Sequence, residues 1–489
     1  MDNNGKHIAP GGSIISGLAW KLAERFGVQG MQFVIQIVLA RLLDPEHYGV
    51  LSLMIIFTTL ANVFIQNGFN TALVQNKDVT EEDYSSVFWV SLAVATVIYV
   101  FLYFLAPVIA VFYEIPELVT PLRVLSLILF PGAVNSVQLA KVNREMDFKQ
   151  VFKSNVGAII VSGIVGIVLA YADFGLWALV IQNITSVVTT TVVMWFSVAW
   201  RPRFVCNFAR IKVLFSFGWK LLVSGLLDTL YQDLRSLVIG KKYDSGTLGF
   251  YNRGKQFPQF IINAINGAVQ SVLLPAMSAE QDDKKKVKLL TRNSIMLSSY
   301  IIFPMMSGLA AVATSLVSLL LTDKWLPCVP YMQIYCFNFA FYPVHTSNLQ
   351  AINAMGRSDI FLKLEIIKKF LGIGMLVVAV FCFESPIAIA MTGVFSAFTS
   401  SFINTYPNKK LIDYSYFEQM KDILPSLLIS LVMFGGVLSV ELLKLSAIVT
   451  LVLQVIAGVV IYVLLSALLR LEPYKMLLGM VKGLLKKSR

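Results

Sequence analysis

The sequence predicts an all-α, polytopic membrane protein: about 14 transmembrane helices in two parallel, pseudo-symmetric six-helix lobes around a central cavity, plus two C-terminal helices. Three observations predict this fold. The 489 residues are 57% hydrophobic and only 14% charged, whereas about 25% charged residues are usual in soluble proteins. Apolar runs long enough to cross a bilayer recur along the chain. Finally, the polar pattern of the first run returns about 200 residues later, which indicates an internal repeat.

The apolar runs are separated by short polar loops and define fourteen predicted spans. No polar stretch exceeds about 20 residues, so we expect no soluble catalytic domain. The spans cover approximately residues 14–40, 48–73, 86–112, 119–141, 154–171, 175–199, 213–239, 247–276, 293–321, 329–355, 361–382, 386–406, 422–440 and 446–469.

Lys and Arg in the loops predict the orientation, because cytoplasmic loops carry an excess of these cations. Of the 31 Lys and Arg residues in loops and termini, 26 fall on the side of the N-terminus, so we expect both termini to be cytoplasmic. This bias also accounts for most of the net charge of +12 without any nucleic acid as partner. The opposite loops carry only Arg41, Lys241, Lys242, Lys324 and Lys444.

The repeat divides the chain into residues 1–205 (N-lobe, helices 1–6), 206–415 (C-lobe, helices 7–12) and 416–489 (helices 13–14 and a basic cytoplasmic tail). An even number of spans in each half makes the repeat parallel. Three blocks match in the same order. They pair Trp20-Lys21-Leu22 with Trp219-Lys220-Leu221, Ala40, Asp44 and Gly49 with Gly240, Asp244 and Gly249, and Pro131, Gln138 and Asp147 with Pro343, Gln350 and Asp359.

Polar side chains at helical spacing form stripes on spans one, two, seven and eight. Lipid does not tolerate such stripes, so we expect them to enclose a polar cavity between the lobes. The alternative is that the amides hold neighbouring helices together by hydrogen bonds. The stripes are Lys21, Arg25, Gln29, Gln32 and Gln36; Asn62, Gln66 and Asn70; Lys220, Ser224, Asp228, Tyr231 and Arg235; and Asn252, Gln256, Gln259, Asn263, Asn266 and Gln270.

Motifs for enzymatic chemistry are absent from the sequence: it contains no HExxH, no GxSxG and no glycine-rich phosphate loop. We therefore expect a protein that is not an enzyme and binds no cofactor or metal. The four cysteines show no metal-ligand spacing. Whether Cys328 and Cys382 pair is left open by the sequence.

Three segments resemble signatures of the polysaccharide transporter branch of the multidrug/oligosaccharidyl-lipid/polysaccharide exporter superfamily. They are LARLLDPEHYGVLSLMIIFTTLANVFIQNGFNTALVQ, VNREMDFK (142–149) and GTLGFYNRGKQFPQFIINAINGAVQSVLLPAMS (246–278). The resemblance is closest to lipopolysaccharide, colanic-acid and teichuronic-acid exporters. It implies a two-lobed flippase in the bacterial cytoplasmic (inner) membrane that works by alternating access. The cargo would be an undecaprenyl-diphosphate-linked oligosaccharide, moved from the inner to the outer leaflet for surface polysaccharide biosynthesis.

The resemblance also implies that cavity cations bind the diphosphate, for which Lys21, Arg25, Lys220 and Arg253 are the candidates. Amides pair well with sugar hydroxyls. Coupling to a proton or sodium gradient, and contact with other polysaccharide assembly proteins, stay open. The alternatives are a drug/cation antiporter of the same superfamily and a membrane polysaccharide polymerase or ligase. The predicted substrate-binding set is Lys21, Arg25, Gln29, Gln32, Gln66, Lys220, Asp228, Tyr231, Arg253, Gln256, Asn263 and Asn266.

Overall fold

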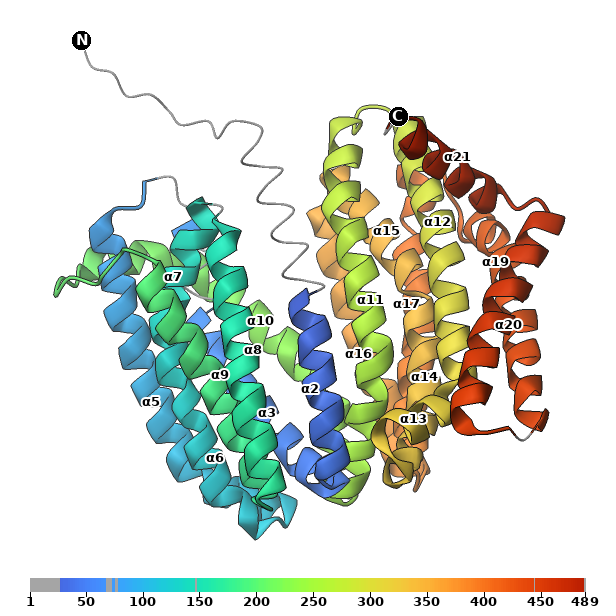
Figure 1. The fold of residues 1–489 in the computed structure, drawn as a ribbon. Helices are drawn as coiled ribbons and strands as arrows, with labels where there is room; N and C mark the ends of the chain where they lie inside the picture. Colours follow the sequence, from blue (N-terminus) through green and yellow to red (C-terminus); the bar gives the residue numbers. More distant parts are fainter. Residues whose placement is uncertain (1–26, 67–72, 75–77, 146, 444, 488–489) are drawn as a thin grey trace. The chain divides into compact units, whose positions relative to one another are not determined.

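The computed structural model describes residues 27–66, 73–74, 78–145, 147–443 and 445–487 (Figure 1). Throughout these ranges the regular elements are helices, and no strand occurs. The predicted all-α fold class is confirmed. The chain divides into two compact units, residues 1–249 and 250–489, and each is described by itself.

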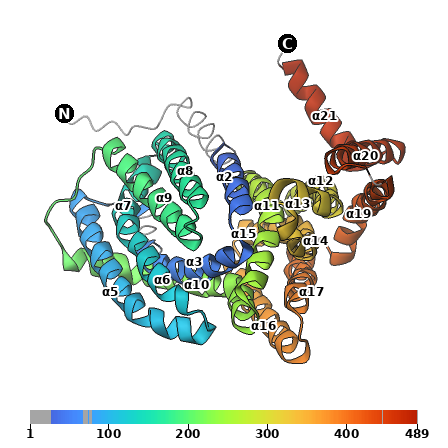
Figure 2. The same ribbon diagram turned by 60° about the horizontal axis from the view of Figure 1, so that its bottom comes forward.

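The first unit consists mainly of long helices. Of these, α8 and α9 run side by side over most of their length (Figures 1 and 2). The helices are α2 (Gln29–Leu42), α3 (Pro45–Gln66), α5 (Glu81–Tyr113), α6 (Val119–Leu125), α7 (Leu129–Glu145), α8 (Phe148–Tyr171), α9 (Leu176–Ser197) and α10 (Phe208–Lys242).

The second unit begins within α11 (Ser245–Ala279). Within this unit, the contact between α12 and α19 is more extensive than the contact between any other two helices. The remaining helices are α12 (Lys284–Ala311), α13 (Ala313–Leu321), α14 (Val329–Ala340), α15 (Tyr342–Ala354), α16 (Ser358–Cys382), α17 (Pro386–Thr405), α18 (Asn408–Leu411), α19 (Tyr416–Ser439), α20 (Ala447–Leu468) and α21 (Glu472–Lys487).

The two compact units divide at residues 249/250, whereas the repeat predicts a lobe boundary at 205/206, which stays a prediction. Helix α10 packs against α3 and α5 and so belongs to the first unit. An ion pair contributes to this packing, because the Arg210 guanidinium donates to both carboxylate oxygens of Asp83, at 2.9 and 2.6 Å. The Asp83 side chain is fully buried. A bidentate pair of this kind is strong and geometrically specific, so it fixes the start of α10 to the start of α5.

Ten helices in the described ranges are long and apolar enough to span a membrane, or eleven if the two arms of α10 form one span. The bend in α10 measures 52° and lies between Ser216 and Gly218, where small residues commonly permit a kink. The protein is thus an integral membrane protein, and the number fourteen stays a prediction.

The three other predicted spans fall on α2, on α14 with α15, and on α16. Only residues 29–42 of the first are described as an α-helix. The second is interrupted at Phe341, and Pro343 follows in the first turn of α15, where the missing N–H of proline is tolerated. Helix α16 carries three charged residues close together, Glu365, Lys368 and Lys369, of which Glu365 and Lys368 form an ion pair.

The starts of α3 and α11 approach each other as closely as two backbones can. A Cβ atom on Gly49 would lie 1.7 Å from the carbonyl oxygen of Ser245, and one on Gly249 would lie 2.1 Å from that of Pro45. The contact is reciprocal between positions that the repeat pairs at an offset of 200 residues. A twofold relation produces this kind of self-complementary contact. It supports the predicted parallel repeat, whose superposition over whole lobes stays a prediction.

Candidate functional site

Helix α10 exposes charged side chains along its predicted span. Lys220 and Asp228 are exposed, and Tyr231 is half-buried. The same helix also exposes apolar side chains, among them Val223, Leu227 and Leu230. A charged side chain at the centre of a bilayer costs at least about 2.5–3.5 kcal/mol. This face of α10 therefore fits water or a polar ligand better than lipid.

Helix α11 carries a second polar face, but its members differ in their surroundings. Gln256 and Asn263 are exposed. Arg253 is only 5% exposed; its guanidinium donates to Gln256 Oε1 at 2.7 Å and lies 5.1 Å from the Trp325 ring. The protein thus already surrounds the Arg253 cation, and its role as a diphosphate ligand stays a prediction.

The amide of Asn266 also has a protein partner. Its Oδ1 accepts a hydrogen bond of 2.5 Å from the hydroxyl of Thr346 on α15. This contact is a hydrogen bond between neighbouring helices, which is the alternative role of the amides that the sequence left open. The α11 stripe therefore combines helix-to-helix contacts at Arg253 and Asn266 with exposed amides at Gln256 and Asn263.

The remaining predicted residues lie in the first unit. Lys21 and Arg25 fall outside the described residues. On α2, Gln29 is half-buried and Gln32 is exposed, and Gln66 is exposed at the end of α3. The binding roles of the whole predicted set stay predictions.

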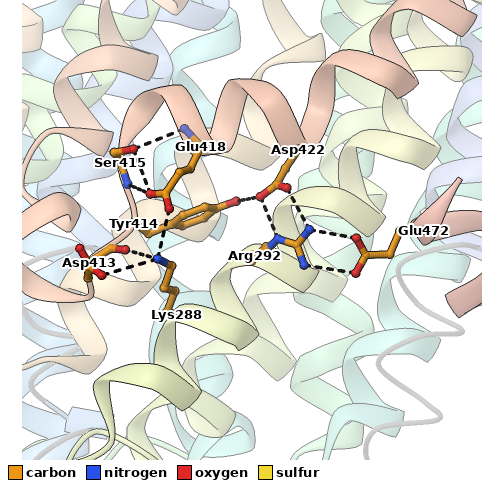
Figure 3. A network of polar contacts seen from close by, with 8 residues as sticks. All are labelled: Lys288, Arg292, Asp413, Tyr414, Ser415, Glu418, Asp422 and Glu472. Carbon is orange, nitrogen blue, oxygen red and sulfur yellow. Dashed lines mark hydrogen bonds and ion pairs between the residues drawn. The ribbon is translucent and has the colours of Figure 1, made fainter.

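A network of charged groups, which sequence reasoning missed, joins α12, α19 and α21 (Figure 3). Arg292 donates to both carboxylate oxygens of Asp422, each at 3.0 Å, and to those of Glu472 at 3.2 and 2.9 Å. The Tyr414 hydroxyl donates to Asp422 at 2.7 Å. Burial, together with the Asp422 carboxylate, raises the pKa of Tyr414, so this hydroxyl keeps its proton at neutral pH. The network holds the beginning of α21 against α12 and α19.

An apolar groove of about 530 Å³ runs between α11, α12, α13, α19 and α20 of the second unit. Met305, Leu309, Met433, Val455, Val459 and Tyr462 are among the residues that line it. A groove of this composition is suited to a hydrocarbon chain, because burial of apolar surface is favourable by about 25 cal/mol per Å². Sequence spacing does not predict this groove, since its lining comes from five helices.

Metal and cysteine chemistry receives no support from the described part of the chain. There, no group of three or more His, Cys, Asp or Glu side chains is placed to hold a metal ion. Cys328 is a buried free thiol and Cys382 an exposed one, so the pairing that the sequence left open does not occur in this structure.

The arrangement of helices is that of known membrane transporters. The chain is similar to the lipid II flippase MurJ in its inward closed conformation, with a TM-score of 0.73 and 15% identity over 95% of this chain and all of that one. It is also similar to an inward-facing multidrug transporter of the MATE family, with a TM-score of 0.59 and 15% identity over 81% of this chain and 99% of that one. At such identities the likeness defines the fold alone.

The family follows from the sequence comparisons. Residues 38–330 match the family described as "Polysaccharide biosynthesis protein", and the chain belongs to this family. It is 24% identical to the teichuronic acid biosynthesis protein TuaB of Bacillus subtilis over 71% of this chain and 72% of that protein. It is also 24% identical to the lipopolysaccharide biosynthesis protein WzxC of Escherichia coli over 74% of each chain.

Proposed function

We propose that the protein is a flippase for a lipid-linked oligosaccharide, which it moves from the inner to the outer leaflet of the bacterial cytoplasmic membrane. It changes no covalent bond in its cargo. The relatives serve the biosynthesis of teichuronic acid and lipopolysaccharide, and a lipid II flippase shares the fold. The cargo would carry an undecaprenyl-diphosphate group, and transport would proceed by alternating access with both termini in the cytoplasm.

The observation that carries this proposal is the exposed cation Lys220 on α10. A diphosphate group leaving water needs a cationic partner, and lysine supplies a point charge for phosphate. Tyr231 on the same helix supplies a neutral hydrogen-bonding group for sugars. In the second unit, Gln256 and Asn263 on α11 are exposed amides of the same chemistry. The apolar groove of the second unit offers a surface for the prenyl chain.

A drug/cation antiporter is the second candidate, and the exposed carboxylate of Asp228 favours it. An organic cation would need this acid, whereas an anionic lipid would need Lys220. Transport should therefore depend on Lys220 if the protein is a flippase, and on Asp228 if it is an antiporter.

Replacing Lys220 with glutamine is expected to reduce export of the surface glycan at unchanged protein abundance, while the lipid-linked precursor accumulates inside the cell. Loss of one desolvated charge-assisted contact costs about 1.5–3 kcal/mol, or roughly ten- to hundredfold in affinity. The measurement is surface glycan and precursor in a strain deleted for its own exporter and complemented with each variant. The matched variant Asp228→Asn should change export much less. Normal export by Lys220→Gln, together with cationic-drug resistance that is lost in Asp228→Asn, would favour the antiporter.

A further inference from the structure

A second polar pocket, apart from the stripes of α10 and α11, lies between α7, α8 and α9 of the first unit. It has a volume of about 300 Å³, at the lower end of the range of about 300–1,000 Å³ found for ligand sites. A site of this size suits a single ring better than an extended chain. Its lining includes Asn135, Asn143, Phe148, Ser154, Asn155 and Thr190.

The lining of this pocket is polar but uncharged. Three amides and two hydroxyls contribute to it, and the described lining residues include no acidic, basic or histidine side chain. The lining itself offers an ionised ligand no counter-charge, which disfavours such a ligand. Amides and hydroxyls instead form hydrogen bonds with neutral polar groups. The pocket therefore selects for a neutral, hydroxyl-bearing ligand.

The hydrogen bonds already present in the pocket indicate whether a ligand would donate or accept hydrogen bonds there. Ser154 donates to the carbonyl of Val151 at 2.9 Å, and Thr190 donates to that of Ser186 at 3.0 Å. Each hydroxyl has thereby used its proton, and its oxygen can still accept. Asn135 Oδ1 is a buried acceptor that receives no hydrogen bond from the described residues, which is unfavourable unless a ligand or water donates to it. Ser154, Thr190 and Asn135 Oδ1 thus present acceptors, and the hydroxyls of a sugar can donate to them.

The pocket also has a position that suits an early step of transport. It lies where α7 ends at Glu145 and α8 begins at Phe148. The basic residues of this connection predict that it is cytoplasmic. We propose that the pocket is a sugar subsite, which binds one neutral ring of the lipid-linked oligosaccharide on the cytoplasmic side. This inference rests on the proposed function for its choice of cargo.

The test uses the purified full chain in lipid nanodiscs and the methyl glycosides of glucose, galactose, mannose and N-acetylglucosamine as probes. Saturation-transfer NMR gives the apparent affinity for each. We expect at least one glycoside to bind, and we expect Asn135→Leu and Thr190→Val each to weaken it roughly tenfold. Inorganic phosphate should not compete. Thr190→Val keeps the shape of the side chain, so it remains informative if Asn135→Leu does not fold.

A control variant is available on the same helix bundle. The Asn183 amide on α9 donates to the carbonyl of Leu179 at 2.8 Å and is not part of the lining, so Asn183→Ala should bind the probe like the unmodified protein. Absence of binding by all four glycosides, equal binding by Thr190→Val, or competition by phosphate would each overturn the subsite. Normal transport of lipid-linked glycan with any of these results would remove the subsite and leave the proposed function. If glycoside binding depended on Asn135 and Thr190 but the protein transported no glycan, the subsite would stand and the proposed function would be refuted.

Discussion

Replacing Gly249 with alanine is expected to prevent accumulation of the folded protein, or to lower its thermal stability by a large amount. The added Cβ would lie 2.1 Å from the carbonyl oxygen of Pro45, and a backbone atom cannot rotate away as a side chain can. Overpacking usually costs about 1–3 kcal/mol and sometimes more. Gly49→Ala should be at least as damaging, because its Cβ would lie 1.7 Å from the carbonyl oxygen of Ser245. The measurement is monodispersity and melting temperature in detergent.

The control for this prediction is a glycine with open space around it. No atom lies within 4 Å of a Cβ built on Gly374 or on Gly435. Alanine at either position should leave stability unchanged or raise it, since glycine in a helix is about 1 kcal/mol less favourable than alanine. If Gly249→Ala and Gly374→Ala melted alike, the close crossing of α3 and α11 would be refuted.

Replacing Arg292 with alanine should destabilise the attachment of α19 and α21 to α12. Two bidentate contacts would be lost at once, and Asp422, whose side chain is only 15% exposed, would keep Tyr414 as its remaining contact in the network (Figure 3). Hydrogen bonds to charged groups contribute about 1.5–3 kcal/mol each in buried surroundings, and the partial exposure of Arg292 reduces this amount. We expect a lower melting temperature and faster proteolysis near residues 470–473.

Arg357 provides the matched comparison for Arg292. It forms a bidentate pair with Asp359 at 2.9 Å, but both side chains are about half exposed. Such surface pairs contribute about 0–1 kcal/mol, so Arg357→Ala should barely alter the melting temperature. The melting temperature of Arg292→Lys should lie between those of Arg292→Ala and Arg357→Ala, because an ammonium keeps the charge but lacks the planar, forked donors of a guanidinium. An Arg292→Ala variant as stable as Arg357→Ala would contradict the role assigned to the network.

Periodicity and repetition predicted the features that depend on sequence spacing. Exposure of Lys220 and Asp228 agrees with the stripe on α10, because residues four and three apart share a helix face. The offset of 200 residues predicted that Gly49 and Gly249 occupy equivalent positions in the two halves. Only the structure shows that Gly49 packs against Ser245 at the start of α11 and Gly249 against Pro45 at the start of α3.

Contacts between distant segments could not be predicted in this way. The Arg210–Asp83 pair joins residues 127 positions apart, and Arg292–Asp422 joins residues 130 apart. Nothing in either local sequence identifies its partner. The burial of Arg253 depends on Trp325, which reaches it from another segment of the second unit. The break between α14 and α15 at Phe341 has a local cause in Pro343. Hydropathy alone nevertheless predicts residues 329–355 as one continuous span.

Transport by the purified protein tests the central proposal most directly. Proteoliposomes would carry an undecaprenyl-diphosphate-linked oligosaccharide with a labelled sugar, and an impermeant glycosidase outside would report the fraction that has crossed. The proposal predicts that protein accelerates crossing far above protein-free vesicles, and that Lys220→Gln lowers the rate by roughly ten- to hundredfold. Equal crossing in vesicles with and without correctly folded protein would contradict it.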